Sequence, residues 1–217
     1  YRVCSKHKTI AHMEWRCPQY VKPGLGYVDG FVTSSILPTI PFWKRVGFTP
    51  NNLTFLGMIS SGLCVWFLHT RNPAAAILFL LVRWYCDYAD GLLARRYNLT
   101  STFGDWFDHV VDVLFFIGVV VVLVLSEYKK GTGNWCLDNL RIILLSVLLA
   151  FTAAFVVQTG CVERRHNPVK ANNKQETSIS RLRILCPAVL EPVLKFFDNG
   201  TLYLVMIVIF VIFCNRP

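Results

Sequence analysis

Residues 87–112 read DYADGLLARRYNLTSTFGDWFDHVVD, and this stretch lies between two strongly apolar segments. In a chain with a formal net charge of +9, the stretch carries five carboxylates: Asp87, Asp90, Asp105, Asp108 and Asp112. An ionised Asp near the centre of a membrane helix costs about 2.5–3.5 kcal/mol, so four of them left unpaired cost on the order of 10 kcal/mol. The cluster therefore needs something that offsets its charge.

The spacing of these carboxylates indicates what offsets it. Asp87 and Asp90 are three residues apart, and Asp108 and Asp112 are four apart, so each pair shares one face of a helix. Two helices, each with such a pair at its polar end, can close around divalent cations. Because all-oxygen ligand sets favour Mg²⁺ or Mn²⁺ over zinc, the stretch predicts a site for one of these ions.

The composition indicates a membrane protein. Of 217 residues, 54% are hydrophobic and only 16% are charged, whereas soluble domains usually carry about 25% charged residues. The apolar residues fall into long runs, which is typical of a chain that crosses the bilayer several times. The excess positive charge belongs to tails and loops, where it favours contact with anionic lipid over nucleic acid.

We expect an all-α, polytopic membrane helix bundle of about six transmembrane helices. Four spans are clear and two are marginal, and they cover residues 53–69, 74–89, 104–125, 140–157, 184–197 and 202–213. Before them, a polar, irregular tail leads into residues 27–47, which fit either an interfacial helix with Trp43 at headgroup depth or a linker. We divide the chain into an N-terminal region at 1–48 and a membrane domain at 49–217.

Two features of the spans carry further expectations. Arg83 lies inside the second span, where a cation predicts a partner carboxylate or a side chain that snorkels to the surface. Cysteines within the apolar runs should behave as small hydrophobes without disulfides. Counting spans puts the Asp stretch, the basic N-terminus and the polar loop 161–183 on one side, which the positive-inside tendency makes the cytoplasmic side.

Eight positions of the stretch form a pattern with fixed spacing. The pattern is Asp87-x2-Asp90-Gly91-x2-Ala94-Arg95-x8-Gly104-x3-Asp108-x3-Asp112. It resembles the signature of the CDP-alcohol phosphotransferases, integral membrane enzymes of phospholipid synthesis, at every position. The resemblance implies transfer of a phospho-alcohol or phosphatidyl group from a CDP-alcohol to an acceptor alcohol, with release of CMP. It also implies a homodimer in the membrane, and the endoplasmic reticulum as its location in a eukaryote.

The same resemblance implies roles for individual residues. Metal binding is implied for Asp87, Asp90, Asp108 and Asp112, and Asp112 is also the implied general base. Contacts to the nucleotide or substrate are implied for Pro50, Asn51, Thr54, Gly91, Ala94, Arg95, Ser101 and Gly104. Binding of the acceptor's phosphate is implied for three basic residues of the polar loop 161–183: Arg164, Arg165 and Lys174. For residues 49–54, helix capping alone is an equally good interpretation.

The substrate stays open between two branches of that family. The Ala-Arg-Arg-x-Asn run and Phe107-Asp108-His109 resemble enzymes that join CDP-choline or CDP-ethanolamine to diacylglycerol, and we lean toward this type. The short chain instead fits enzymes that use CDP-diacylglycerol with inositol, serine or glycerol phosphate. A cation transporter or channel that uses the Asp cluster as its binding site is the alternative of another class.

Overall fold

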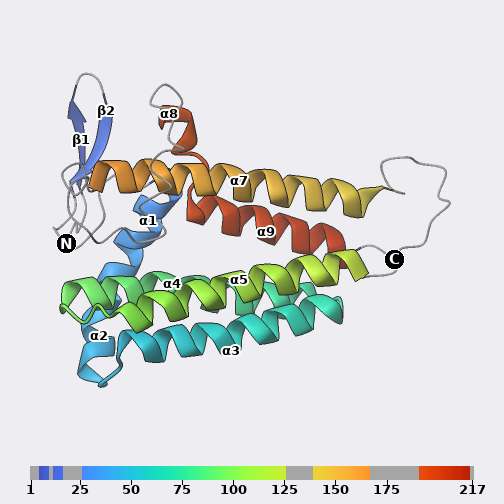
Figure 1. Cartoon of the computed structure of the whole chain (residues 1–217), viewed down its shortest axis with the longest axis horizontal. Coiled ribbons are helices and arrows are strands. Elements are labelled where there is room, and N and C mark those ends of the chain that lie inside the picture. The colour runs from blue at the N-terminus through green and yellow to red at the C-terminus, as the bar shows by residue number, and fades with distance from the viewer. Residues whose placement is uncertain (1–4, 10–11, 17–25, 126–138, 167–190, 216–217) are drawn as a thin grey trace. The chain divides into compact units, whose positions relative to one another are not determined.

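The structure, a computed structural model, describes residues 5–9, 12–16, 26–125, 139–166 and 191–215. Its helices in chain order are α1 (Tyr27–Ile36), the 3-10 helix η1 (Leu37–Thr39), α2 (Ile40–Arg45), α3 (Pro50–His69), α4 (Pro73–Arg96), α5 (Thr102–Leu125), α7 (Leu140–His166), α8 (Glu191–Leu194) and α9 (Asn199–Cys214) (Figure 1). This confirms the predicted all-α membrane bundle. The prediction of an irregular tail is wrong in part, because β1 (Ser5–Thr9) and β2 (His12–Arg16) form an antiparallel hairpin.

Three of the described helices are long and apolar enough to cross a membrane: Pro50–His69, Thr102–Leu125 and Leu140–Cys161. They correspond to the first, third and fourth predicted spans. The second predicted span falls in α4, which is 24 residues long but carries Arg83, Asp87 and Asp90 within its central turns. The sixth falls in α9, an apolar helix of 16 residues. The fifth lies largely outside the described residues, and its described part holds only the short helix α8.

The chain divides into two compact units. One consists of residues 1–38 and 150–202, and the other of residues 39–149 and 203–217. We call them the terminal unit and the site unit, because the second contains all of the Asp stretch. These units are defined by compactness, whereas the predicted boundary at residue 48 separates an N-terminal region from a membrane domain. That boundary stays a prediction.

In the site unit, α3 packs against both α4 and α5 (Figure 1). Helices α3 and α4 begin alike: Thr49 and Asn72 each accept a hydrogen bond from the backbone N–H three residues later, and each is followed by a proline. Capping by Thr or Asn satisfies a backbone donor that has no partner inside the helix, and proline suits the first turn. Thr49 therefore caps α3 as expected, whereas contact of Pro50, Asn51 and Thr54 with a nucleotide stays a prediction.

The connections of these helices are short and turn sharply. Arg71 and Asn98 both adopt positive φ angles, 56° and 53°, in the links that follow α3 and α4. Asn tolerates this backbone region better than most residues because its short side chain bonds locally. The short link after α4 returns the chain, so that α5 starts near the end of α4.

Helix α2 is attached to α4 through one tyrosine. The Tyr85 hydroxyl lies 2.6 Å from the Thr39 hydroxyl and accepts a hydrogen bond from the Trp43 indole N–H at 2.6 Å. Phe42, Lys44 and the end of the helix remain exposed. Residues 27–47 are therefore largely helical and not an extended linker, and the Trp43 indole N–H is directed at α4.

In the terminal unit, two aspartates, Asp29 and Asp198, cap the starts of α1 and α9. Asp198, fully buried, accepts hydrogen bonds from the backbone N–H groups of Val28 and Asp29 at 2.8 and 2.9 Å, in the first turn of α1. Its other oxygen accepts from the N–H and hydroxyl of Thr201 in the first turn of α9. Asp29 in turn accepts from the N–H of Gly200 at 2.8 Å. Two buried carboxylates therefore satisfy the free donors of both helices.

The cysteine expectation holds for three residues. Cys64, Cys86 and Cys214 are buried free thiols. Cys161 is disulfide-bonded, but it follows the fourth predicted span, so the expectation for cysteines within the apolar runs does not cover it. Burial explains the first three, because an isolated thiol inside an apolar helix packs as a small hydrophobe.

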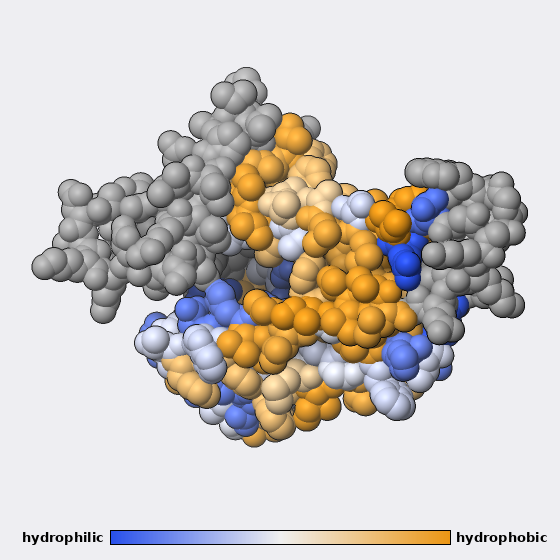
Figure 2. All heavy atoms as spheres, turned by 45° about the vertical axis from the view of Figure 1, so that its right-hand side comes forward, coloured by the Kyte–Doolittle hydropathy of each residue, from blue (hydrophilic) through white to orange (hydrophobic). Residues whose placement is uncertain are grey.

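The surface of the described helices is strongly apolar. Figure 2 shows hydrophobic residues spread across the face that it presents. On α5 the exposed side chains include large aliphatic residues at Val113, Leu114, Ile117, Val121 and Val124. Such a continuous apolar surface would be a liability in water and suits contact with lipid chains.

Candidate active site

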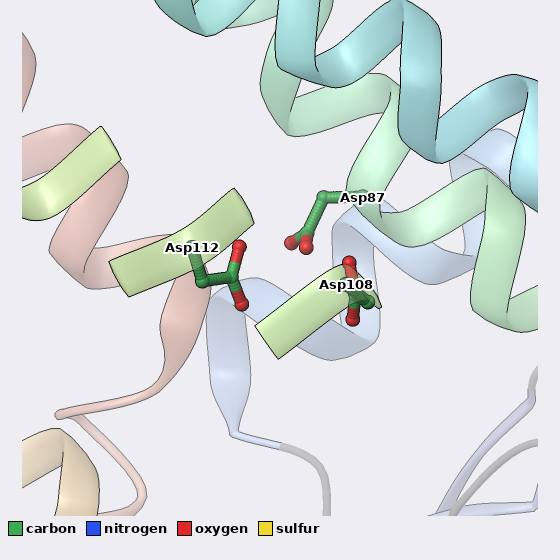
Figure 3. Close-up of side chains that lie close together, drawn as sticks. All are labelled: Asp87, Asp108 and Asp112. Atoms are coloured by element: carbon green, nitrogen blue, oxygen red, sulfur yellow. The ribbon is translucent and has the colours of Figure 1, made fainter. Parts of the chain in front are cut away.

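Three of the predicted metal ligands lie together between α4 and α5. Asp87, Asp108 and Asp112 each offer a carboxylate oxygen, and these oxygens all lie within 4.8 Å of one another. Figure 3 shows the three side chains directed toward a common point, one from α4 and two from α5. Like charges this close repel, so the arrangement favours a bound cation, and hard carboxylate oxygens suit Mg²⁺ or Mn²⁺.

Asp90, the fourth predicted ligand, points to a different neighbour. Its side chain is buried, with 5% of the residue exposed, and its Oδ2 accepts a hydrogen bond from the Thr54 hydroxyl at 2.6 Å. Thr54 was predicted to contact the nucleotide, whereas here its hydroxyl binds the carboxylate and, more distantly at 3.2 Å, the carbonyl of Pro50. Thr54 therefore fixes the orientation of Asp90.

Arg83 forms an ion pair with Asp112. Its Nη2 donates to Asp112 Oδ1 at 2.5 Å, and its Nη1 donates to the hydroxyl of Tyr203. Arg83 is only 4% exposed, while the Asp112 side chain is 48% exposed. The expectation of a carboxylate partner for Arg83 is thus confirmed, and the snorkelling alternative is excluded by its burial.

A pocket of about 180 Å³ joins these groups. Its lining comes from α3, α4 and α5: Thr54, Gly57, Arg83, Asp87, Asp90, Asp108, Val111 and Asp112. All four signature carboxylates therefore face one pocket, which is the arrangement a diphosphate held by divalent cations requires.

The predicted glycines lie against polar side chains of the site unit. A Cβ on Gly104 would lie 2.8 Å from Asn51 Oδ1 and 3.0 Å from Ser101 Oγ, and the Ser101 hydroxyl accepts from the Gly104 N–H. A Cβ on Gly91 would lie 3.0 Å from a guanidinium nitrogen of Arg95. At both positions the missing side chain leaves room for a neighbouring side chain of the protein. Close approach of a nucleotide at these glycines stays a prediction.

This geometry brings together three of the eight residues predicted to contact the nucleotide. Asn51, Ser101 and Gly104 bring the start of α3 to the start of α5. Ala94 lies half-buried one residue before Arg95, in the last turns of α4. Their contact with a nucleotide stays a prediction.

The residues predicted to bind the acceptor lie elsewhere in the chain. Arg164 and Arg165 belong to the last turn of α7, so the helix continues into what was predicted to be a loop starting at Cys161. Lys174 lies outside the described residues. Asp105, which the signature does not require, is exposed in the first turn of α5.

The sequence interpretation missed Tyr203. This tyrosine belongs to α9, is 4% exposed and stacks on Trp84 with ring centroids 5.0 Å apart. A hydroxyl in the middle of an otherwise aliphatic helix was the available signal, because a buried Tyr hydroxyl usually has a partner.

An apolar helical bundle with four carboxylates around one pocket defines an integral membrane protein with a candidate divalent-cation site. The CDP-alcohol phosphatidyltransferase family model matches residues 48–214, more than half of the chain. The chain therefore belongs to the CDP-alcohol phosphatidyltransferase family.

Several curated proteins are similar to parts of this chain. A CDP-diacylglycerol–glycerol-3-phosphate 3-phosphatidyltransferase of Rickettsia felis is 34% identical over 108 residues, covering 48% of this chain and 59% of that protein. An archaetidylinositol phosphate synthase of Pyrococcus horikoshii is 30% identical over 98 residues, covering 45% and 50%. An uncharacterized protein of Aquifex aeolicus is 39% identical over 75 residues, covering 35% and 38%. The matches thus span about 38–59% of these relatives. No solved structure matches the chain.

Proposed function

We propose that this protein is a divalent-metal-dependent phosphatidyltransferase that uses CDP-diacylglycerol and a phosphorylated polyol, with release of CMP. Family membership supports the reaction class. The name of one relative contains CDP-diacylglycerol and glycerol 3-phosphate, and that of another contains archaetidylinositol phosphate, and these names support the substrate class. The motif favoured enzymes that use CDP-choline or CDP-ethanolamine, but these relatives do not support that type. The proposal therefore takes the CDP-diacylglycerol alternative.

The observation that carries the proposal is the grouping of Asp87, Asp108 and Asp112 within 4.8 Å, in a pocket that Asp90 also lines. A substrate diphosphate brings further negative charge to a place that already holds four carboxylates. Such a complex would need divalent cations, which the four carboxylates would hold, to offset this charge. Family membership together with this pocket favours a transferase over an ion channel or transporter.

In this proposal the residues of the site have different roles. Asp87, Asp90, Asp108 and Asp112 would hold Mg²⁺ or Mn²⁺, and such ions would supply positive charge against the diphosphate and the departing CMP. Asp112 accepts the proton of the acceptor hydroxyl while that oxygen forms its bond to the phosphorus nearest the lipid. The bond from this phosphorus to the CMP oxygen breaks, and CMP carries away the electron pair.

Cationic side chains complete the proposed site. Arg95, whose guanidinium lies beside Gly91, can donate two parallel hydrogen bonds to a phosphate group. Arg164, Arg165 and Lys174 are proposed to bind the phosphate of the acceptor. A site that faces the cytoplasm, and a homodimer, belong to the same proposal, and in a eukaryote the endoplasmic reticulum is the proposed location.

The test is CMP release by the purified, detergent-solubilised protein. CDP-diacylglycerol is supplied with glycerol 3-phosphate or inositol phosphate, and CDP-choline with diacylglycerol serves as the competing pair, each with Mg²⁺ or Mn²⁺. We expect CMP from the first donor only, and none after chelation. Asp112→Asn should abolish release, and Asp105→Asn, which changes an exposed carboxylate outside the pocket, is the matched control.

The outcomes separate the candidate functions. Release of CMP from CDP-choline would instead support an enzyme that joins an aminoalcohol phosphate to diacylglycerol. A protein that releases no CMP from either donor, yet moves divalent cations across vesicle membranes, would support the transporter and end the present proposal.

A further inference from the structure

Arg83 occupies a place in the pocket that the eight-position signature does not include, since the signature begins at Asp87. It lies on α4 one turn before Asp87, so the two side chains share a helix face. Within the described part of the chain its hydrogen-bond partners are Asp112 on α5 and Tyr203 on α9, and its Nε has none. One side chain thus connects three helices at the candidate active site.

Aromatic rings fix the guanidinium on its other sides. Its central carbon lies 4.4 Å from the centroid of the Phe115 ring and 5.6 Å from that of Tyr203. Tyr203 itself stacks on Trp84, with an angle of 4° between the ring planes. A planar cation held by rings and by two hydrogen bonds has little freedom to rotate.

Asp112 differs from its partner in exposure. Its side chain is 48% exposed, whereas Arg83 is 4% exposed. A half-exposed Asp without a fixed partner samples several rotamers, and ordering a side chain costs entropy. The bond from the rigid guanidinium to Oδ1 sets the carboxylate plane and therefore the direction of its second oxygen, Oδ2.

We propose that Arg83, held by the Tyr203 hydroxyl, is a positioning residue that orients the Asp112 carboxylate for proton transfer. This inference rests on the proposed function, in which Asp112 is the general base. Orientation matters because a misplacement of about 1 Å at a reacting group lowers turnover by about 100-fold. Arg83 acts through Asp112 and needs no contact with substrate.

The choice of carboxylate connects Arg83 to the proposed base. Asp90 lines the same pocket and is 5% exposed, yet Arg83 bonds the half-exposed Asp112 instead. Among the described residues that line the pocket, the one buried guanidinium thus bonds the proposed base.

The experiment compares three variants of the full chain by steady-state CMP release from CDP-diacylglycerol. Arg83→Gln should lower kcat by about 100-fold while KM for CDP-diacylglycerol stays near its wild-type value. Tyr203→Phe keeps the ring on Trp84 and removes only the hydroxyl, so we expect a loss of about 10-fold in kcat. Arg83→Lys should fall between Arg83→Gln and wild type, because an ammonium cannot reproduce the fixed fork of guanidinium donors.

Matched controls come from the same chain. Arg141→Gln removes an arginine that donates to the Val124 carbonyl near the far end of α5. Tyr27→Phe removes the hydroxyl of a tyrosine in the terminal unit. Both should leave kcat unchanged.

A second measurement does not depend on turnover. Calorimetric titration of each variant with CMP in the presence of Mn²⁺ should give an affinity close to wild type, because Asp87, Asp90 and Asp108 would still hold the ions to which CMP binds, and Arg83 itself holds neither. Loss of CMP binding together with loss of kcat would mean that Arg83 is structural, and an unchanged kcat in Arg83→Gln would mean that it has no role in turnover.

Failure of the inference is distinct from failure of the proposed function. If the wild-type protein releases CMP and the Arg83 variants do so equally well, only the positioning role is overturned. If the wild-type protein releases no CMP from any donor, the proposed function is overturned, and the role of Arg83 with it.

Discussion

Replacement of Thr54 by valine tests how the pocket holds Asp90. The two side chains have nearly the same shape, so the change removes the hydroxyl and leaves the packing of α3 against α4 in place. Thr54 and Asp90 are each 5% exposed, and their hydrogen bond is 2.6 Å long. Water therefore has little access with which to replace the lost donor.

The expected effect follows from that burial. A hydrogen bond to a charged group contributes about 1.5–3 kcal/mol, which corresponds to a factor of about 10 to 100 in an equilibrium constant. Residues that orient metal ligands change metal affinity by about the same factor. We expect Thr54→Val to weaken Mn²⁺ binding by about 10–100-fold, because Asp90 would no longer be held toward the pocket.

The assay is a titration of Mn²⁺ monitored by electron paramagnetic resonance, with CMP release measured over the same range. Thr54→Ser keeps the hydroxyl and should remain close to wild type. Ser61→Ala is the matched control, since it removes another buried hydroxyl of α3, one that donates to the Gly57 carbonyl instead of a carboxylate. An unchanged Mn²⁺ midpoint in Thr54→Val would refute the assignment of Asp90 as a ligand that Thr54 orients.

Three further predictions concern other parts of the chain. Asp198→Ala should lower the free energy of unfolding by about 3 kcal/mol, measured by thermal unfolding in detergent, because buried donors of two helix starts lose their acceptor. Gly104→Ala should raise KM for the CDP-linked donor, since its Cβ would press on Asn51, whereas Gly62→Ala has open space and should be neutral. Mn²⁺ at one hundred times its Kd should stabilise the wild-type protein by about 2.7 kcal/mol, and much less after Asp108→Asn.

The sequence predicts the helices of the site unit well, because their limits are local. Capping residues and prolines mark the starts of α3 and α4, and the structure begins both helices there. The predicted end of the second span at residue 89 is too early. Hydropathy marks the apolar length of a segment, while the helix continues to Arg96 with polar turns that carry the site.

The arrangement of the four carboxylates is only partly contained in their spacing. Residues three apart differ by about 60° around a helix axis, because each residue turns about 100°. That difference separates Asp87, which faces the α5 carboxylates, from Asp90, which meets Thr54 on α3. The spacing predicts that both lie near one face, but the position of α3 decides which neighbour each one reaches.

The partners of Arg83 could not be predicted from the sequence pattern alone. A cation within an apolar helix predicts a carboxylate partner, and five carboxylates were candidates. The choice of Asp112 depends on how α5 packs, and the second partner, Tyr203, comes 120 residues later in the chain. No local rule connects positions that far apart, because α9 reaches the pocket only through tertiary packing.

The same reasoning explains why the signature omits this part of the site. Metal and diphosphate chemistry fixes the identity and spacing of the ligands, since carboxylates must meet within a few ångströms of each other. Orientation of the base sets no such spacing, because any buried donor that reaches Asp112 can serve. Here the donor is Arg83, one turn before Asp87, and its own anchor is the final helix. If Arg83 orients the base as proposed, the Tyr203 hydroxyl makes α9 part of that arrangement.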